Sequence, residues 1–422
     1  MSIDVALKLY QEGKFDAAIV LFEKILQQAP NDYQALHFLG VAKGHAGDWQ
    51  AGNELIKKAL AVKPDYADAC NSLGYGLNQL RQYDEAIPYF EKAIADKPNF
   101  SEAIFNLTEA LHTLGRYEEA IPYYQQIAKL NQNNAEIYNN WGLALQALNR
   151  MEEAVACYDK AAVNNPDFAA AYNNKGTALQ ALSRYAEAIQ CYERAIEVKS
   201  DYAEAYFNLG FVLQEQKQYE RAIKNYDQAI VINPKFVEAH HNRGNTLKAL
   251  NRFDEAMASL NQALSINANH YEALFSKSLL SLSLSLFEEG WTLYEYRWKV
   301  KEEKLFPVIK RPQWRGESLS GKNILITPEQ GIGDQIMMLR YIPLLEKMGA
   351  MCLIITDPSL EALVKRSFTK AHVASFPISA EKIDYWLSIM SLPLALKTFT
   401  EADIPQHTPY LIPDLHKTND YT

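Results

Sequence analysis

Apolar and small residues follow a helical period that restarts every 34 residues over residues 1–304. Within residues 203–236, Ala205, Leu209 and Leu213 mark the apolar face of one helix. The apolar face of a second helix follows at Ala222, Ile223, Tyr226, Ala229 and Ile230. Each segment is close to the usual length of a helix, and a short turn separates the two. The pattern therefore predicts a helix–turn–helix hairpin as the repeating unit.

Small and aromatic residues recur at fixed places in this 34-residue unit. The glycine position holds Gly40, Gly74, Gly142, Gly176, Gly210 and Gly244, with Thr108 in the one gap. Twelve residues further on stand Ala86, Ala120, Ala154, Ala188, Ala222 and Ala256. Nine residues on, an aromatic recurs at Phe15, Trp49, Tyr83, Tyr117, Tyr185, Tyr219 and Phe253. Small residues let helices approach closely, and prolines such as Pro98 and Pro166 end the second helices.

This spacing resembles the tetratricopeptide repeat (TPR) over residues 1–270, in eight copies. A ninth unit, 271–304, departs from the pattern because Ser278 replaces the glycine and Arg297 the second alanine. It is expected to cap the stack or to join it to the C-terminal segment. The resemblance implies a mostly α protein, a right-handed solenoid whose first helices line its concave side.

Asparagines two positions before the glycine position suggest a ligand. This asparagine column consists of Asn106, Asn140, Asn174, Asn208 and Asn242. An Asn side chain can both donate to and accept from a peptide amide, so the column predicts binding of an extended peptide or protein segment in the concave surface. Phe207 and Phe211 are expected to add apolar contacts. The alternative is that each Asn bonds to the neighbouring repeat.

The distribution of charge narrows the range of partners. Residues 1–304 hold 30 Lys and Arg against 39 Asp and Glu, whereas 305–422 hold 12 of each, so the net charge of −9 lies in the repeats. An acidic surface repels phosphate backbones, which argues against nucleic acid. The sequence shows no apolar run long enough to span a membrane and no signal peptide, so we expect a cytoplasmic protein. No metal site is expected, because the four cysteines are expected to be buried among apolar residues.

The repeat pattern fails after Trp298, and residues 305–422 are predicted to form an α/β domain. Strands are expected at 323–327 and 351–355, with helices at 335–347 and 358–367. A further strand and helix are expected within 382–399. Strands that alternate with helices predict a parallel sheet.

A loop with two glycines separates the first of these strands from its helix. Gly331 and Gly333 are expected to allow a tight turn, with a helix N-terminus behind it that favours anions. The loop is neither a P-loop nor a dinucleotide fingerprint, since Ile336 stands where the third glycine would be.

Residues 312–413 resemble the first half of a GT-B glycosyltransferase of the kind fused to TPR arrays in bacteria. The resemblance is carried by the Gly-Trp pair at Gly290 and Trp291 and by Pro312–Gly316, Glu329–Asp334, Leu339–Tyr341, Ser391–Pro393 and Pro409–Leu411. The glycine loop also resembles that of heptosyltransferases, which implies that Asp334 is the base that activates the acceptor hydroxyl. A nucleotide sugar would then be the donor, and no other cofactor is expected. The alternative for Asp334 is an N-cap of the following helix.

A GT-B enzyme closes two Rossmann-like halves around its substrates, and the donor sits mainly in the second. The chain ends at Thr422, after the first half. We therefore expect a peptide-binding scaffold derived from a TPR-fused glycosyltransferase, without full activity as this chain. The alternative is a hexosyl-type protein O-glycosyltransferase, or one part of a split enzyme completed by a second subunit, with the acceptor held by the repeats.

Overall fold

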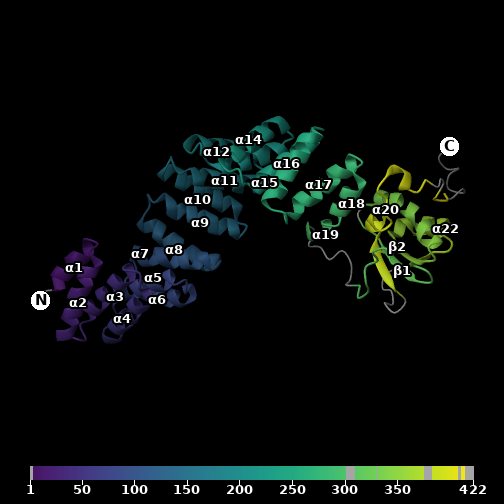
Figure 1. The fold of residues 1–422 in the computed structure, drawn as a ribbon. Coiled ribbons are helices and arrows are strands. Elements are labelled where there is room, and N and C mark those ends of the chain that lie inside the picture. The colour runs from purple at the N-terminus through teal and green to yellow at the C-terminus, as the bar shows by residue number, and fades with distance from the viewer. Residues whose placement is uncertain (1–2, 301–308, 330, 375–382, 407–409, 414–422) are drawn as a thin grey trace. The chain divides into compact units, whose positions relative to one another are not determined.

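The computed structural model describes residues 3–300, 309–329, 331–374, 383–406 and 410–413. Its contacts divide the chain into two compact units, Met1–Gln216 and Lys217–Thr422 (Figure 1). The 34-residue sequence pattern continues on both sides of this division. A solenoid can be divided between repeats in this way because each repeat contacts only its neighbours. The boundary predicted at 304/305 lies outside the described residues.

The described part of the first unit consists of helices, six hairpins followed by a single helix. Its helices are α1 (Ile3–Gln11), α2 (Phe15–Gln28), α3 (Tyr33–His45), α4 (Trp49–Val62), α5 (Ala67–Gln79), α6 (Tyr83–Asp96), α7 (Ser101–Thr113), α8 (Tyr117–Leu130), α9 (Ala135–Ala147), α10 (Met151–Asn164), α11 (Ala169–Ala181), α12 (Tyr185–Val198) and α13 (Ala203–Glu215). The second unit begins with α14 (Tyr219–Ile232), α15 (Val237–Ala249), α16 (Phe253–Ile266), α17 (Tyr271–Ser283), α18 (Phe287–Tyr294) and α19 (Arg297–Val300). The predicted helical repeats are confirmed, and the described helices of residues 271–304 are α17, α18 and α19, which end at Val300.

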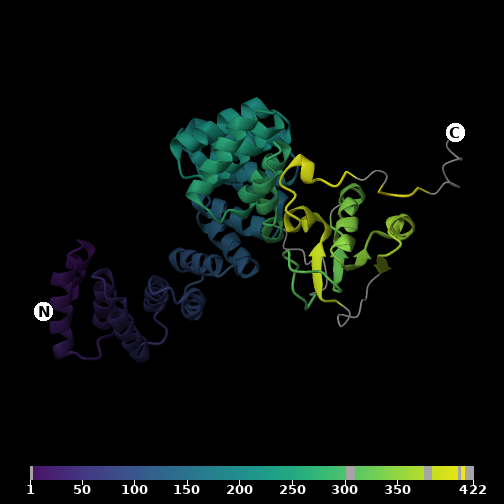
Figure 2. The same ribbon diagram turned by 45° about the vertical axis from the view of Figure 1, so that its right-hand side comes forward.

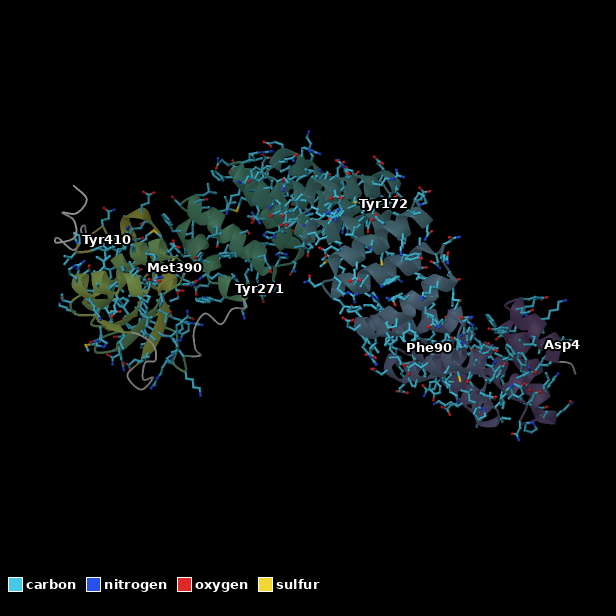
Figure 3. All side chains as sticks on the ribbon, turned by 180° about the vertical axis from the view of Figure 1, so that it is seen from behind. Asp4, Phe90, Tyr172, Tyr271, Met390 and Tyr410 are labelled. Atoms are coloured by element: carbon cyan, nitrogen blue, oxygen red, sulfur yellow. The ribbon has the colours of Figure 1, made fainter. Side chains whose placement is uncertain are left out.

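Each glycine position is small because a buried side chain of the same hairpin lies against it. A Cβ atom on Gly142 would lie 2.6 Å from the Tyr158 ring, and one on Gly176 would lie 2.6 Å from the Tyr192 ring. Both tyrosines are fully buried. The aromatic residue 16 positions after the glycine therefore fills the space that the glycine leaves, and it closes the two helices of a hairpin on each other. Phe90 occupies the same position in its own repeat, inside the first unit (Figure 3).

Adding one methyl group at this contact is expected to destabilise the first unit. Gly176→Ala should lower the free energy of unfolding by about 1–3 kcal/mol, because the Tyr192 ring has no free space to move into. Gly333→Ala is the control, since nothing lies within 4 Å of a Cβ there. Urea unfolding followed by circular dichroism measures both variants. Equal stability of the two would mean that the glycine position is not a close contact.

The bends of the hairpins share one backbone feature. Among the described residues, a left-handed residue recurs every 34 positions, with φ of 60° at Arg81, 59° at Ser183 and 57° at Lys217. The Ser183 N–H donates to Gln180 O and the Arg184 N–H to Leu179 O, which ends α11. The recurring aromatic position, nine residues after the glycine, is the first residue of the second helix, as at Tyr185.

A small parallel sheet forms the rest of the second unit. Its strands are β1 (Asn323–Thr327), β2 (Met351–Ile355), β3 (His372–Ala374) and β4 (Tyr385–Ser388), in the order β3-β2-β1-β4. All pairs are parallel, with Ile324 opposite Cys352 in β2 and opposite Tyr385 in β4. The predicted parallel sheet is confirmed, and β3 is an addition that the sequence analysis missed.

Short helices cover this sheet and connect its strands (Figures 1 and 2). They are α20 (Ile332–Met338), α21 (Ile342–Lys347), α22 (Glu361–Ser367) and α23 (Leu392–Ala395). One core joins them to the last repeat, because Trp291 and Tyr294 of α18 belong to the same hydrophobic cluster as Ile324 of β1 and Met390. Figure 3 shows the place of Met390 in this part of the chain. The degenerate ninth unit is thus built onto the α/β part of the chain.

Candidate functional site

The asparagine column lies on the first helices of successive repeats. Asn106 is on α7, Asn140 on α9, Asn174 on α11 and Asn208 on α13, and each is half-buried. In the second unit Asn242 holds the same place on α15 and is also half-buried. The structure therefore keeps the predicted register of the column.

Most members of the column donate a hydrogen bond to the previous repeat. Asn106 Nδ2 donates to Asn71 Oδ1 at 3.0 Å, in a contact that spans 35 residues. The same contact joins Asn174 Nδ2 to Asn139 Oδ1 at 3.0 Å and Asn208 Nδ2 to Asn173 Oδ1 at 2.9 Å. The alternative drawn from the sequence, a bond to the neighbouring repeat, is thus present in the structure. Whether the column also binds peptide stays a prediction.

Histidines take the place of the accepting Asn at two positions. His37 Nε2 lies 2.9 Å from Ser72 Oγ in the first unit, and His241 Nε2 lies 2.9 Å from Ser276 Oγ in the second. Burial lowers the pKa of both His37 and His241 to about 4, and the neighbouring charge of His270 adds to the shift at His241. Both rings are therefore neutral at pH 7.

Where a phenylalanine replaces the accepting residue, this bond cannot form. Phe105 occupies the acceptor position 35 residues before Asn140, and Asn140 Nδ2 donates instead to Glu109 Oε1 at 3.0 Å. Phe207 occupies the same acceptor position 35 residues before Asn242. Phe207 and Phe211 are half-buried and share α13 with Asn208, as the predicted apolar contribution requires.

Carboxylates stand one helical turn before the column on the same helix face. This acidic column, which the sequence analysis did not single out, consists of Asp68, Glu102, Glu136, Glu204, Glu238 and Glu272. Glu102, Glu136 and Glu204 are exposed. Its signal in the sequence was an acidic second residue in six of the first helices, α5, α7, α9, α13, α15 and α17, a position that also suits the positive end of the helix dipole.

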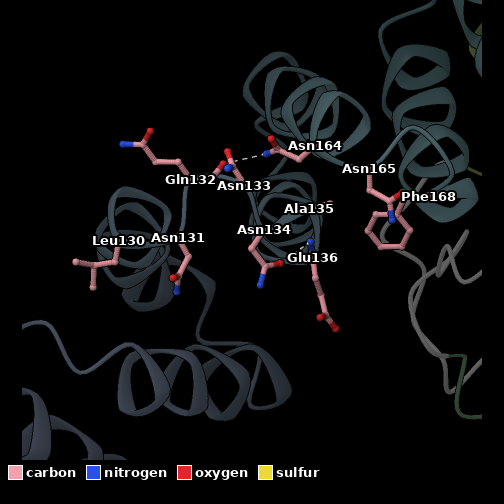
Figure 4. A pocket seen from close by; sticks show the side chains of 10 residues that line it. All are labelled: Leu130, Asn131, Gln132, Asn133, Asn134, Ala135, Glu136, Asn164, Asn165 and Phe168. Atoms are coloured by element: carbon pink, nitrogen blue, oxygen red, sulfur yellow. Dashed lines mark hydrogen bonds between the residues drawn. The ribbon is translucent and has the colours of Figure 1, made fainter.

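An open polar pocket lies at the connection between α8 and α9 (Figure 4). Asn131, Gln132 and Asn133 form one wall, Asn164 and Asn165 at the end of α10 form another, and the Asn164 amide donates to Gln132 O at 3.0 Å. Asn134 caps α9 by accepting from the backbone N–H groups of Glu136 and Ile137. Glu136 of the acidic column lines this pocket.

The two glycines of the second unit lie at the start of α20. Gly331, with φ −75°, is its N-cap, and Gly333 lies inside the helix. Residue 330 of the same connection lies outside the described residues, and the predicted tight turn stays a prediction. Asp334 is the third residue of α20, so the alternative that it caps the helix is wrong. Its half-buried side chain makes no hydrogen bond or ion pair with another described residue. The role of Asp334 as a base stays a prediction.

A buried ion pair forms the centre of the α/β part, and the sequence analysis missed it. Arg297 of α19 is 2 % exposed and Glu329, which follows β1, is 5 % exposed. Arg297 Nε and Nη2 donate to the two oxygens of Glu329 at 2.5 and 2.8 Å. Arg297 also donates to Glu295 Oε1 at 2.8 Å and to Ser391 Oγ at 2.8 Å, and Ser388 donates to Glu329. Burial opposes the charge of Arg297, but the bonds and charges of the two glutamates raise its pKa.

This ion pair occupies a distinctive place in the sheet. β2 and β3 lie on one side of β1 and β4 on the other, so the order of the strands reverses between β1 and β4. Open parallel sheets commonly bind ligands beside the carboxyl ends of strands at such a point. Here Glu329 and Ser388 stand at those two ends, and the Glu329 carboxylate accepts from both Ser388 and the Arg297 guanidinium. Side chains of the protein itself therefore fill this place.

No group of His, Cys, Asp and Glu that could hold a metal ion is present among the described residues. All four cysteines are buried and unpaired, and burial raises the pKa of Cys157 and of Cys352 to about 12. Such thiols are poor nucleophiles at neutral pH. Within the described part of the chain, no helix has the length and apolar character needed to cross a membrane.

The fold and the recurring contacts define a solenoid protein built from helical hairpins of 34 residues. Models of the tetratricopeptide repeat match residues 9–72, 77–139, 135–168, 167–235 and 201–269. These matches run from residue 9 to residue 269 with a gap only at 73–76, and they do not reach the ninth unit, 271–304. The repeats of this chain belong to the tetratricopeptide-repeat family.

Known proteins similar to this chain match its repeats in part. Protein FlbA of Caulobacter vibrioides is 28% identical over 160 residues, which is 33% of this chain and 26% of FlbA. The match thus spans about a quarter of FlbA. YrrB, described as a TPR protein with an unusual peptide-binding site, is 23% identical with a TM-score of 0.39, covering 44% of this chain and 97% of YrrB. PilF of Pseudomonas aeruginosa is 20% identical with a TM-score of 0.43, covering 50% of this chain and 97% of PilF.

Proposed function

We propose that the chain is a scaffold that binds an extended, basic peptide along the first helices of its repeats. The observation that carries the proposal is the orientation of the asparagine column. In Asn106, Asn174 and Asn208 the amide nitrogen is held by the previous repeat, while no described residue donates to the oxygen. Each half-exposed side chain thus presents a fixed acceptor to a ligand.

The fixed acceptors suit the main chain of a peptide. A peptide N–H can donate to each Oδ1, and the bond to the previous repeat orients the acceptor before the ligand arrives, so less entropy is lost on binding. The contact needs only the oxygen, in contrast to the two-sided contact predicted from the sequence. Each such bond contributes about 0.5–1.5 kcal/mol net, so several together give weak, adaptable binding.

The acidic column favours a peptide that carries lysine or arginine. Glu136 and Glu204 are exposed and form no ion pair with another described residue. Each stands four residues before a member of the asparagine column, on the same face of its helix. A chain bound along the asparagines therefore passes these carboxylates, which attract its basic side chains and repel acidic ones.

The proposal predicts that the oxygens, rather than the repeat-to-repeat bonds, determine affinity. Asn174→Ala with Asn208→Ala should weaken capture of a lysine-rich peptide about tenfold, or about 1.4 kcal/mol. The control is Asn139→Ala with Asn173→Ala, which removes the acceptors of the same two bonds, keeps the ligand-facing oxygens and should lose less affinity, through the loss of their orientation alone. Fluorescence anisotropy with a labelled peptide measures both variants. An equal loss of affinity in the two would mean that the column acts only through repeat packing.

The second candidate function is transfer of a hexose to a bound protein, in a chain derived from a TPR-fused glycosyltransferase. The observation that favours it is the half-exposed Asp334 carboxylate in the first turn of α20, directly after β1 of a parallel sheet. A base at this edge would take the proton of the acceptor hydroxyl, and a nucleotide sugar would be the donor.

Catalysis by Asp334 predicts turnover that a conservative change removes. With a panel of nucleotide sugars and a lysine-rich acceptor peptide, Asp334→Asn should lower transfer by at least about 100-fold, the usual contribution of a general base. Peptide capture should be unchanged, because it rests on the repeats. Mass spectrometry of the peptide measures transfer. Transfer that survives in Asp334→Asn would exclude this residue as the base.

A further inference from the structure

A second cleft lies beside the buried ion pair, between the last repeat and the edge of the sheet. Its walls come from α18 and α19, from residues 313–315, and from α23 with the turn after it. Its volume is about 670 Å³, within the usual range for sites that bind small molecules. It lies wholly within the second unit.

Aromatic rings form much of its lining. Trp298, Trp314 and Phe399 line the cleft together with Leu387 and Leu394. Trp314 is 1 % exposed and its Nε1 donates to Glu317 O at 2.8 Å. The Arg297 guanidinium lies 4.5 Å from the ring centroid of Trp298. Trp314 is thus a covered part of the cleft wall, whereas the half-buried Trp298 and Phe399 keep part of their rings accessible. The Trp298 ring is held by a contact that no ligand has to supply, which favours binding of a flat ring.

The backbone that carries Trp314 is also fixed. Gln313 pairs in parallel with Trp386 of β4, and the Trp314 N–H donates to Trp386 O at 2.9 Å. On the opposite wall, Ser391 is 2 % exposed and is held by Arg297 and Glu295. The cleft is a preformed part of the fold.

Cations surround the aromatic lining. Lys299, Arg315 and Lys397 line the cleft and are exposed, and none forms an ion pair with another described residue. The Arg315 guanidinium lies near the Glu317 carboxylate, which partly offsets its charge. Glu295, the carboxylate that lines the cleft, is bonded to Arg297 and Ser391. The charge that remains available to a ligand is positive, in a protein whose net charge is −9.

We propose that this cleft binds a small molecule with a flat aromatic body and an anionic group. The body would lie against Trp298 and Phe399, and the anion would pair with the exposed cations Lys299 and Lys397. A basic peptide of the kind proposed for the repeats carries the wrong charge for this cleft, so the two sites are independent. Neither proposal depends on the other.

Two probes that share one ring system and differ in charge test the proposal. Indole-3-acetate carries an anion, whereas tryptamine carries a cation on a similar body, and acetate carries the anion without the body. Isothermal titration of the full chain should detect indole-3-acetate at least about tenfold tighter than either of the others. Binding of tryptamine as tight as that of indole-3-acetate, or no heat with indole-3-acetate at millimolar concentration, would overturn the proposal.

Variants locate the binding on the chain. Lys299→Gln with Lys397→Gln should weaken indole-3-acetate about tenfold or more and leave the residual binding independent of salt. Phe399→Ala should weaken it as well. Lys370→Gln is the matched control, an exposed cation of the same unit that does not line the cleft. Circular dichroism confirms that each variant is folded. Unchanged affinity in the double lysine variant would place the probe elsewhere and overturn the assignment.

Discussion

Replacing Arg297 with methionine should lower the free energy of unfolding of the second unit by about 3–5 kcal/mol. The side chain of Met fills much of the same space, so the loss comes from Glu329, which stays buried without its counter-charge. The serines that remain near Glu329 cannot replace a cation. Urea unfolding followed by tryptophan fluorescence measures the change well, because four of the six tryptophans lie between residues 291 and 386.

Two further variants separate the buried charge from a simple loss of contacts. Arg297→Met with Glu329→Gln removes both charges and should recover much of the loss, since well-packed neutral side chains often replace a buried ion pair at little cost. Arg252→Met is the exposed control. Its salt bridge with Glu255 is 42%/50% exposed, and its loss should cost less than about 1 kcal/mol. A similar loss in Arg252→Met and Arg297→Met would contradict the argument from burial.

The sequence could predict the repeats because their signal recurs. A single hairpin offers few apolar positions, but the same glycine, alanine and aromatic positions return every 34 residues and reinforce one another. The structure places Ala188 and Ala222 in the core, fully buried, as the spacing required. Strands at 323–327 and 351–355 were also predictable, because each is a short apolar run bounded by turn residues. β3, at His372–Ala374, is too short and too polar to give such a signal.

The side-chain contacts of the candidate sites could not be predicted from the sequence. The spacing of Asn174 and Asn208 shows that they share a face, but not that their amide nitrogens are engaged by Asn139 and Asn173. That depends on how one hairpin is placed on the next. Arg297 looked like a defect in a repeat, because its partner Glu329 lies 32 residues away in a different kind of fold. Only the packing of the last repeat on the sheet brings the two together.

Acidification from pH 7 to pH 5 should weaken the first unit, and His37 should account for about 2 kcal/mol of the loss. Its pKa is about 4 in the folded chain, against an ordinary value of 6.5, because the ring is buried. As the pH falls below 6.5 the unfolded chain takes up a proton that the folded chain does not. The stabilisation by neutral His37 is therefore complete above pH 6.5 and is lost between 6.5 and 4, to a total of about 3 kcal/mol.

The groups around His37 explain why it resists protonation. The ring is 3 % exposed, with Tyr66 Oη 3.2 Å from Nδ1 and Ser72 Oγ 2.9 Å from Nε2. Both partners are neutral hydroxyls, which do not compensate a positive charge on the imidazole. The carboxylate of Asp68 acts in the opposite direction, but its effect is smaller than that of burial.

His37→Asn is the variant that tests this, because Asn71, Asn139 and Asn173 hold the same place in other repeats. Asn does not titrate, so the stability of the variant should fall by about 2 kcal/mol less than that of the natural chain between pH 7 and pH 5. Hydrogen exchange of the amides in α3 to α5, corrected for the intrinsic effect of pH, reports the change where it occurs. His241→Asn, in the second unit, should leave exchange in α3 to α5 unchanged while removing the equivalent pH dependence around α15. If His37→Asn and the natural chain lose protection in α3 to α5 equally on acidification, His37 is already accessible to protons in the folded state and its burial does not control the pH response.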